Sequence, residues 1–141
     1  NFVRASYMLN GNYVYMFGSA AGDRNAMAYV ARVASGNVTS YSEYEYWDGA
    51  EWVKGDEEAA APIFYGPVDD MSVVYNASRY TYMAIYRSST TGGLVYRDAG
   101  LPEGEWSGEK VLLLDGTLSY SSPSIVSVGN NAVTFIANEV K

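Results

Sequence analysis

The chain has 141 residues, a formal net charge of −7, and neither cysteine nor histidine. These absences exclude disulfide bonds, thiol catalysis, a Ser-His-Asp triad and imidazole metal ligands, so any acid–base chemistry must come from carboxylates or tyrosines. Nine scattered Lys and Arg argue against a nucleic-acid partner, and no apolar run approaches the roughly 18 residues that would predict a membrane partner.

Residues 1–62 predict two hairpins separated by an irregular segment. The predicted strands are residues 6–10, 13–17, 45–47 and 51–53. Between the hairpins we expect a turn or a single helical turn, because Ser40 and Glu43 stand at capping-box spacing. After the second hairpin, residues 56–62 form an acidic segment that is typical of a solvated loop. We interpret residues 1–62 as a partial blade of antiparallel sheet.

Residues 63–116 predict one complete four-stranded antiparallel sheet. Its strands are expected at residues 70–76, 80–87, 93–97 and 110–114, which are rich in β-branched and aromatic side chains and are separated by turn formers. Residues 117–141 predict a further partial blade, whose hairpin has strands at residues 124–128 and 132–136.

The three segments repeat one pattern. Residues 6–10 followed by 13–17 match residues 72–76 followed by 80–84, and a third copy begins at Ser124. A repeated up-and-down four-stranded unit predicts an all-β chain with about two and a half blades of a β-propeller. A meander sandwich with accidental similarity is the alternative.

The composition favours an extracellular protein. Fourteen tyrosines and three tryptophans against four phenylalanines suit half-buried sheet faces and sugar-binding surfaces. Two glycosylation sequons begin at Asn37 and Asn76, both in predicted turns. We therefore expect a secreted protein in which these asparagines are glycan acceptors.

Five motifs, taken in order, carry a resemblance to a known family. They occupy residues 31–33, 44–52, 66–73, 94–97 and 102–107. The same order occurs in a family of secreted propellers, long catalogued as a domain of unknown function, that resembles five-bladed glycoside hydrolases. Some of its members are endo-D-arabinofuranosidases acting on microbial arabinan. The resemblance implies a five-bladed β-propeller and a furanoside polysaccharide as substrate.

The resemblance also implies where catalytic acids would lie. In five-bladed propeller hydrolases they sit at the starts of innermost strands around a central funnel, which points to Asp69 and Asp70. Because neighbouring strand residues face opposite sides, only one of them can face the funnel. Asp70 is preferred, since it stands where the family usually has Glu. The alternative is that both residues end a strand in a turn.

A second funnel carboxylate is not recognisable, although glycoside hydrolysis requires two. The third repeat opens with Ser121-Ser122-Pro123, without an acid, and the first opens at Asn1 to Arg4. The catalytic set is therefore expected to be incomplete in this chain, and enzymatic activity stays open. The alternative function is a non-catalytic glycan-binding or extracellular assembly module.

Aromatic residues near turns and one strand arginine are the candidates for substrate binding. They are Tyr41, Trp47, Trp52 and Arg87. The competing interpretation is that the aromatic rings pack in the core and that the arginine meets a carboxylate or a carbonyl.

No metal site or cofactor is predicted, because no calcium-loop pattern occurs. Calcium held by carboxylates along a propeller axis is the minor alternative. The expected partner is a polysaccharide or other glycan. Open sheet edges further predict self-association, or association with the remainder of a longer chain.

Overall fold

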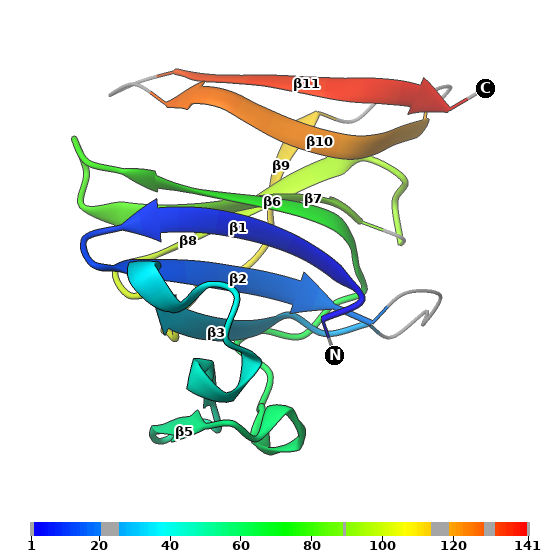
Figure 1. The fold of residues 1–141 in the computed structure, drawn as a ribbon. Helices are drawn as coiled ribbons and strands as arrows, with labels where there is room; N and C mark the ends of the chain where they lie inside the picture. The colour runs from blue at the N-terminus through cyan, green and yellow to red at the C-terminus, as the bar shows by residue number, and fades with distance from the viewer. Residues whose placement is uncertain (1, 21–25, 89, 114–118, 129–131, 141) are drawn as a thin grey trace.

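The structure is a computed structural model that describes residues 2–20, 26–88, 90–113, 119–128 and 132–140 (Figure 1). In its described part, antiparallel strands form three separate sheets, and three short 3-10 turns lie between strands. The all-β prediction is confirmed, and the arrangement is consistent with partial propeller blades.

Sheet 1 contains five strands in sequence order. They are β1 (Arg4–Asn10), β2 (Tyr13–Ser19), β3 (Tyr29–Ala34), β4 (Glu45–Trp47) and β5 (Trp52–Lys54). The predicted hairpins are both present, and Asp48 shapes the second turn by accepting hydrogen bonds from the backbone N–H groups of Ala50 and Glu51 at 2.8 Å. Residues 1–62 were interpreted as a partial blade, but they carry a full set of four strands and a fifth.

The segment between β3 and β4 forms two 3-10 turns, η1 (Ser35–Asn37) and η2 (Tyr41–Glu43). Ser40 is the N-cap residue of η2 but makes no side-chain capping bond. The Glu43 carboxylate instead accepts a hydrogen bond from the Lys54 ammonium at 2.7 Å. The predicted turn is present, but the capping-box chemistry is not, because the Ser40 side chain makes no capping bond and the Glu43 carboxylate bonds Lys54 of β5. The acidic loop contains a third turn, η3 (Glu57–Ala59).

Sheet 2 is the predicted four-stranded unit. Its strands are β6 (Val68–Asn76), β7 (Thr81–Ser88), β8 (Leu94–Ala99) and β9 (Lys110–Leu113), paired in that order. The pairing of β6 with β7 is interrupted by a bulge between Asp69 and Ser72, and Asp70 takes a positive φ of 46° within it. The bulge lengthens the predicted strand at its start and turns Asp70 out of the regular alternation.

Sheet 3 is the hairpin of β10 (Ser119–Val128) and β11 (Val133–Val140). Both predicted strands are present; β10 begins before its predicted start and ends at Val128 as predicted, whereas β11 continues beyond its predicted end. The predicted turn at residues 129–131 lies outside the described residues.

The main core lies between sheets 1 and 2. Its buried members are Phe17 and Val30 from the first sheet, Ala28 and Phe64 from an isolated bridge beside it, and Val68, Val73, Tyr82, Ala84, Tyr86 and Val95 from the second. Aromatic side chains dominate this interface, and Phe64 stacks on Tyr86 with ring centroids 5.8 Å apart. Rings of this size bury enough area to hold two sheets face to face.

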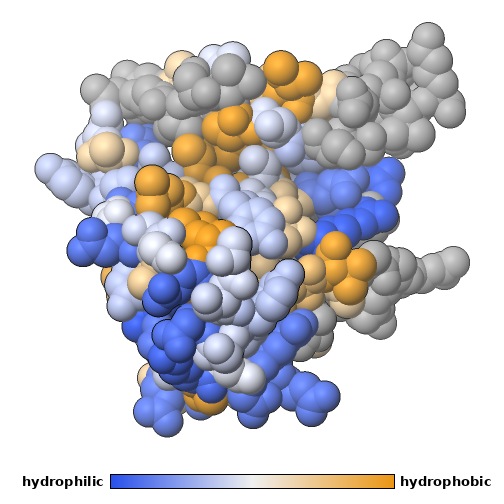
Figure 2. Space-filling model, viewed as in Figure 1, coloured by the Kyte–Doolittle hydropathy of each residue, from blue (hydrophilic) through white to orange (hydrophobic). Residues whose placement is uncertain are grey.

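Apolar surface on the face shown in Figure 2 gathers mainly in its upper and middle parts, at the level of β1, β6 and β10 in Figure 1. The lower part of the same face, around β5, is mostly hydrophilic. Within the described ranges, the structure has no helix with the length and apolar character that crossing a membrane requires.

Candidate functional site

The first strands of the three sheets, β1, β6 and β10, are neighbours in space (Figure 1). Two hydrogen bonds join them in an equivalent way. The backbone N–H of Val73 in β6 donates to the Ser6 hydroxyl of β1 at 3.2 Å, and the N–H of Ile125 in β10 donates to the Ser72 hydroxyl of β6 at 3.3 Å. The repeat seen in the sequence is therefore also a repeat of contacts.

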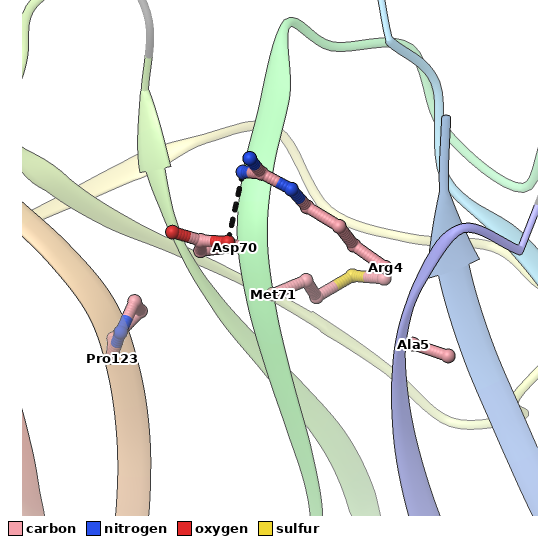
Figure 3. Close-up of a pocket in the computed structure, with 5 residues that line it drawn as sticks. All are labelled: Arg4, Ala5, Asp70, Met71 and Pro123. Atoms are coloured by element: carbon pink, nitrogen blue, oxygen red, sulfur yellow. Dashed lines mark hydrogen bonds and ion pairs between the residues drawn. The ribbon is translucent and has the colours of Figure 1, made fainter. Parts of the chain in front are cut away.

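A pocket of about 240 Å³ lies where these three strands meet. It is lined by Arg4 and Ala5 of β1, Asp70 and Met71 of β6, and Pro123 of β10 (Figure 3). Counted back from the repeated serines Ser6, Ser72 and Ser124, these are equivalent positions in the three repeats. The pocket is thus built by corresponding positions of three strands, near the start of β1 and β6 and within β10.

One ion pair dominates the polar part of this pocket. The Arg4 guanidinium donates a hydrogen bond to the Asp70 carboxylate at 2.9 Å, from one sheet to the next (Figure 3). The two side chains are 44% and 26% exposed, so both are reachable from solvent. The guanidinium offers hydrogen-bond donors and the adjacent carboxylate offers acceptors. A neighbouring donor and acceptor suit a ligand with two adjacent hydroxyl groups.

Of the other predicted site residues, Asp69 and Arg87 lie near Asp70 along the β6–β7 pair. Asp69 pairs with Arg87 across β6 and β7, which brings the two positions together at the same strand end. Arg87 is half-buried. The side chain of Asp69 lies outside what the structure describes, so its predicted role stays a prediction.

Asp70 is the one carboxylate among the residues that line the pocket in the described part of the chain. Among the described residues, the lining therefore supplies one of the two carboxyl groups that retaining and inverting mechanisms both need. No group of three or more carboxylate side chains suited to a metal ion occurs among the described residues.

Trp47 and Trp52 lie elsewhere and pack against each other. They form a cross-strand pair between β4 and β5, with ring centroids 5.4 Å apart, and both contact the main core. The Arg32 guanidinium lies 4.3 Å from the Trp52 ring and 4.5 Å from the Tyr13 ring, and it donates to Glu45 at 2.6 Å. The structure thus gives these tryptophans packing partners and does not bring them to the Asp70 pocket.

Tyr41 differs from the tryptophans because 85% of its surface is exposed. Its ring stacks on Tyr44 with centroids 6.3 Å apart, which holds it in place while one face stays open. Its role as a sugar platform stays a prediction, and Tyr41 lies on η2 and does not line the pocket.

The two predicted glycan acceptors have different environments. Asn37 lies exposed in η1. Asn76 is only 6% exposed, and its side-chain oxygen accepts a hydrogen bond from the Ser78 N–H at 3.0 Å. This burial disfavours glycan attachment at Asn76 in the folded chain, because the amide shapes the turn that follows β6.

A second polar cluster, around Arg97 and Tyr86, joins the strands of sheet 2 to the segments beside them. Arg97 donates to the Tyr86 hydroxyl at 2.9 Å and to the Ser107 and Tyr65 carbonyls, while the Tyr86 hydroxyl donates to Glu109 at 2.6 Å. Burial raises the pKa of Tyr86 well above its ordinary value. The arginine thus meets carbonyls and a phenol, as expected for an arginine within an apolar strand.

Sequence reasoning missed Arg4, Met71 and Pro123 as neighbours of Asp70. A signal was present, since each stands one or two residues before a serine of the repeat. This signal identifies neighbours only if the first strands of the sheets lie side by side, and the sequence does not show that they do.

A family model described as "Domain of unknown function (DUF4185)" matches residues 1–134. The chain is also similar to "Notoamide biosynthesis cluster protein J" of Aspergillus sp. (strain MF297-2), with 28% identity over 138 residues. The aligned part is 92% of this chain and 37% of that protein, so the chain spans little more than a third of the length of this relative.

Proposed function

Because the chain belongs to the DUF4185 family, in agreement with the resemblance of its motifs, we propose that it is part of a secreted, carbohydrate-active β-propeller. The proposal takes the three sheets as successive blades of a five-bladed ring, with β1, β6 and β10 as innermost strands. The resemblance to endo-D-arabinofuranosidases supplies the substrate class, a furanoside polysaccharide. The proposed ligand site is the Arg4–Asp70 pocket.

The observation that supports this site is the meeting of equivalent repeat positions of three neighbouring strands at one charged pocket. In a propeller, innermost strands surround the central funnel, where loops and strand ends are free to carry binding groups. Asp70 has left the regular alternation of β6 through a bulge and a positive φ. Such local backbone features are common next to functional sites, where they re-aim a side chain.

In the catalytic version of this proposal, Asp70 is one carboxylate of the pair that flanks the glycosidic bond. Arg4 positions it and binds a sugar hydroxyl. The second carboxyl group would lie about 5–5.5 Å away for retention, or about 6.5–9.5 Å away for inversion. It would have to come from outside the described lining of the pocket, and Asp69 is a candidate.

The alternative is a glycan-binding propeller without hydrolytic activity. The single carboxylate in the described pocket lining favours this version, because one acid suffices to bind hydroxyl groups but not to cleave by the paired mechanism. Here Arg4 and Asp70 would act as a fixed donor–acceptor pair, and Tyr41 would be an outlying platform.

The experiment is to measure hydrolysis and binding of arabinofuranoside oligosaccharides by the full-length protein and two variants. Asp70→Asn removes the charge at the pocket. Asp98→Asn is the matched control, because Asp98 also pairs with a cation, Lys110, at 3.1 Å and is 39% exposed. Loss of hydrolysis in the first variant alone supports catalysis. Binding without hydrolysis, weakened by Asp70→Asn alone, supports the alternative, and absence of both activities in the unmodified protein contradicts the proposal.

A further inference from the structure

The middle strand of the pocket, β6, carries its bulge at the two residues before the repeated serine. In the register with β7, Asp70 and Met71 together lie opposite the single residue Tyr86. Two residues against one define a β-bulge, which breaks the alternation of faces along a strand. Both bulge residues line the pocket, so the bulge and the pocket occupy the same place in the fold.

The bulge changes which neighbouring sheet Asp70 can reach. In a regular strand, residues two apart share a face, so Asp70 would lie on the face of Ser72. The Ser72 hydroxyl accepts a hydrogen bond from the Ile125 N–H of sheet 3. Asp70 instead bonds Arg4 of sheet 1, although β6 packs on β1 and on β10 alike. The bulge therefore re-aims this carboxylate into the pocket.

The strand β10 carries a bulge at the same repeat position. In the register with β11, Ser122 and Pro123 together lie opposite the single residue Ala137. Each bulge occupies the two residues before the repeated serine, which is Ser72 in β6 and Ser124 in β10. A proline suits a bulge, because a bulged residue leaves the hydrogen-bonded ladder. The pairing of β1 with β2 is regular, so the bulge is not a general feature of these first strands.

The two bulges contribute to the pocket in matching ways. Pro123, the second residue of the β10 bulge, is buried and lines the pocket, as Met71 does in β6 (Figure 3). Ser122, the first residue of the β10 bulge, holds the register position that Asp70 holds in β6. Bulges beside functional sites serve to re-aim side chains. A bulge repeated at one pocket thus marks the first residue of each bulge as a position for ligand contacts.

We propose that Ser122 is a further ligand-binding residue of the Arg4–Asp70 pocket, the counterpart in sheet 3 of Asp70. This inference rests on the proposed function, because it extends the same glycan site. A guanidinium only donates hydrogen bonds and an ionised carboxylate only accepts them, whereas a serine hydroxyl does both. Three neighbouring positions of these kinds suit a ligand with several hydroxyl groups, such as a furanoside unit of a polysaccharide.

The first experiment is calorimetric titration of arabinofuranoside oligosaccharides into the full-length protein and its variants. Ser122→Ala is expected to raise the Kd about fivefold, the value of one neutral hydrogen bond. Ser124→Ala is the matched control and should leave the Kd unchanged, because Ser124 is exposed on the same strand outside the pocket lining. An unchanged Kd for Ser122→Ala, with binding still weakened by Asp70→Asn, contradicts this inference and leaves the proposed function standing. Absence of binding by the unmodified protein overturns both.

A second experiment tests the equivalence of the two bulges without a ligand, so its outcome does not depend on the proposed function. The chain has no cysteine, so Asp70→Cys can be combined with either Ser122→Cys or Ser124→Cys and each pair joined by a short thiol-reactive crosslinker. The pair with Ser122→Cys is expected to react several-fold faster, because both thiols then reach one pocket and have the higher effective concentration. Circular dichroism checks that both double variants fold. Equal rates, or a faster reaction of the pair with Ser124→Cys, would overturn the assignment of Ser122 to the pocket.

Discussion

At the scale of single residues, Tyr86 shows how one buried polar group joins several elements. Its hydroxyl receives a hydrogen bond from Arg97 and donates one to Glu109, while its ring stacks on Phe64. A buried phenol that both accepts and donates a hydrogen bond avoids the penalty of an unpaired buried hydroxyl, and removing it leaves a cation and a carboxylate without their shared partner. We expect Tyr86→Phe to lower the free energy of unfolding by about 1–3 kcal/mol.

The raised pKa of Tyr86 predicts a pH dependence with a definite sign. Burial raises the pKa in the folded chain, whereas the unfolded chain has the ordinary value of about 10. The stabilisation is complete below about pH 10 and is lost as pH rises further, because only the unfolded chain then releases the proton. Urea titrations from pH 8 to 11 should show a shallower alkaline loss of stability for Tyr86→Phe than for the unmodified chain. Equal slopes would contradict this assignment.

At the scale of elements, Arg32 attaches the short hairpin of β4 and β5 to the rest of sheet 1. Its guanidinium lies between the rings of Tyr13 and Trp52 and bonds Glu45. We expect Arg32→Ala to cost about 1–2 kcal/mol and Arg32→Lys part of it, since an ammonium keeps the charge but not the planar stacking.

Denaturant midpoints, with tryptophan emission as the local probe, measure this effect. The control is Lys54→Ala, which removes an exposed pair with Glu43 from the same hairpin. It should cost less than about 1 kcal/mol. A larger effect of Lys54→Ala than of Arg32→Ala would show that stacking on Arg32 does not hold the hairpin.

The elements also show what local sequence can predict. Apolar alternation and turn residues located the strands of sheet 2 and the hairpin around Asp48. They did not show that β4 pairs with β3, where Arg32 meets Glu45, because the partner of a strand is set by contacts distant in sequence. The candidate site has the same limit. Asp70 could be selected from a motif, but Arg4 joins it only through the packing of β1 on β6.

The alignment of the second strands of the first two repeats, as predicted from the sequence, was shifted by one residue. The sequence match aligned Tyr13 with Tyr80, whereas the structure pairs Asn10 with Tyr13 and Asn76 with Thr81. The turn after β6 is longer, and Tyr80 lies in it with a positive φ of 54°. A one-residue shift exchanges the two faces of a strand. Only the structural register reveals which apolar residues face the next sheet.

At the scale of the whole molecule, sheets 1 and 2 share one core and should unfold together. Phe17 of β2 meets Trp106, from the connection between β8 and β9, with ring centroids 6.1 Å apart, and Tyr15 meets Tyr82 at 6.1 Å. Neither sheet can open without exposing aromatic rings of the other. A single cooperative transition is the expected result.

Single-tryptophan variants test this cooperativity. One variant keeps Trp52 in sheet 1 and the other keeps Trp106 beside sheet 2, with the remaining tryptophans changed to phenylalanine. Their urea unfolding curves should have the same midpoint. Phe17→Ala should shift both by the same amount and cost about 3–5 kcal/mol, because it opens a cavity at the shared interface. If the Trp106 curve kept its midpoint while the Trp52 curve moved, the two sheets would be independent units and the shared core would not couple them.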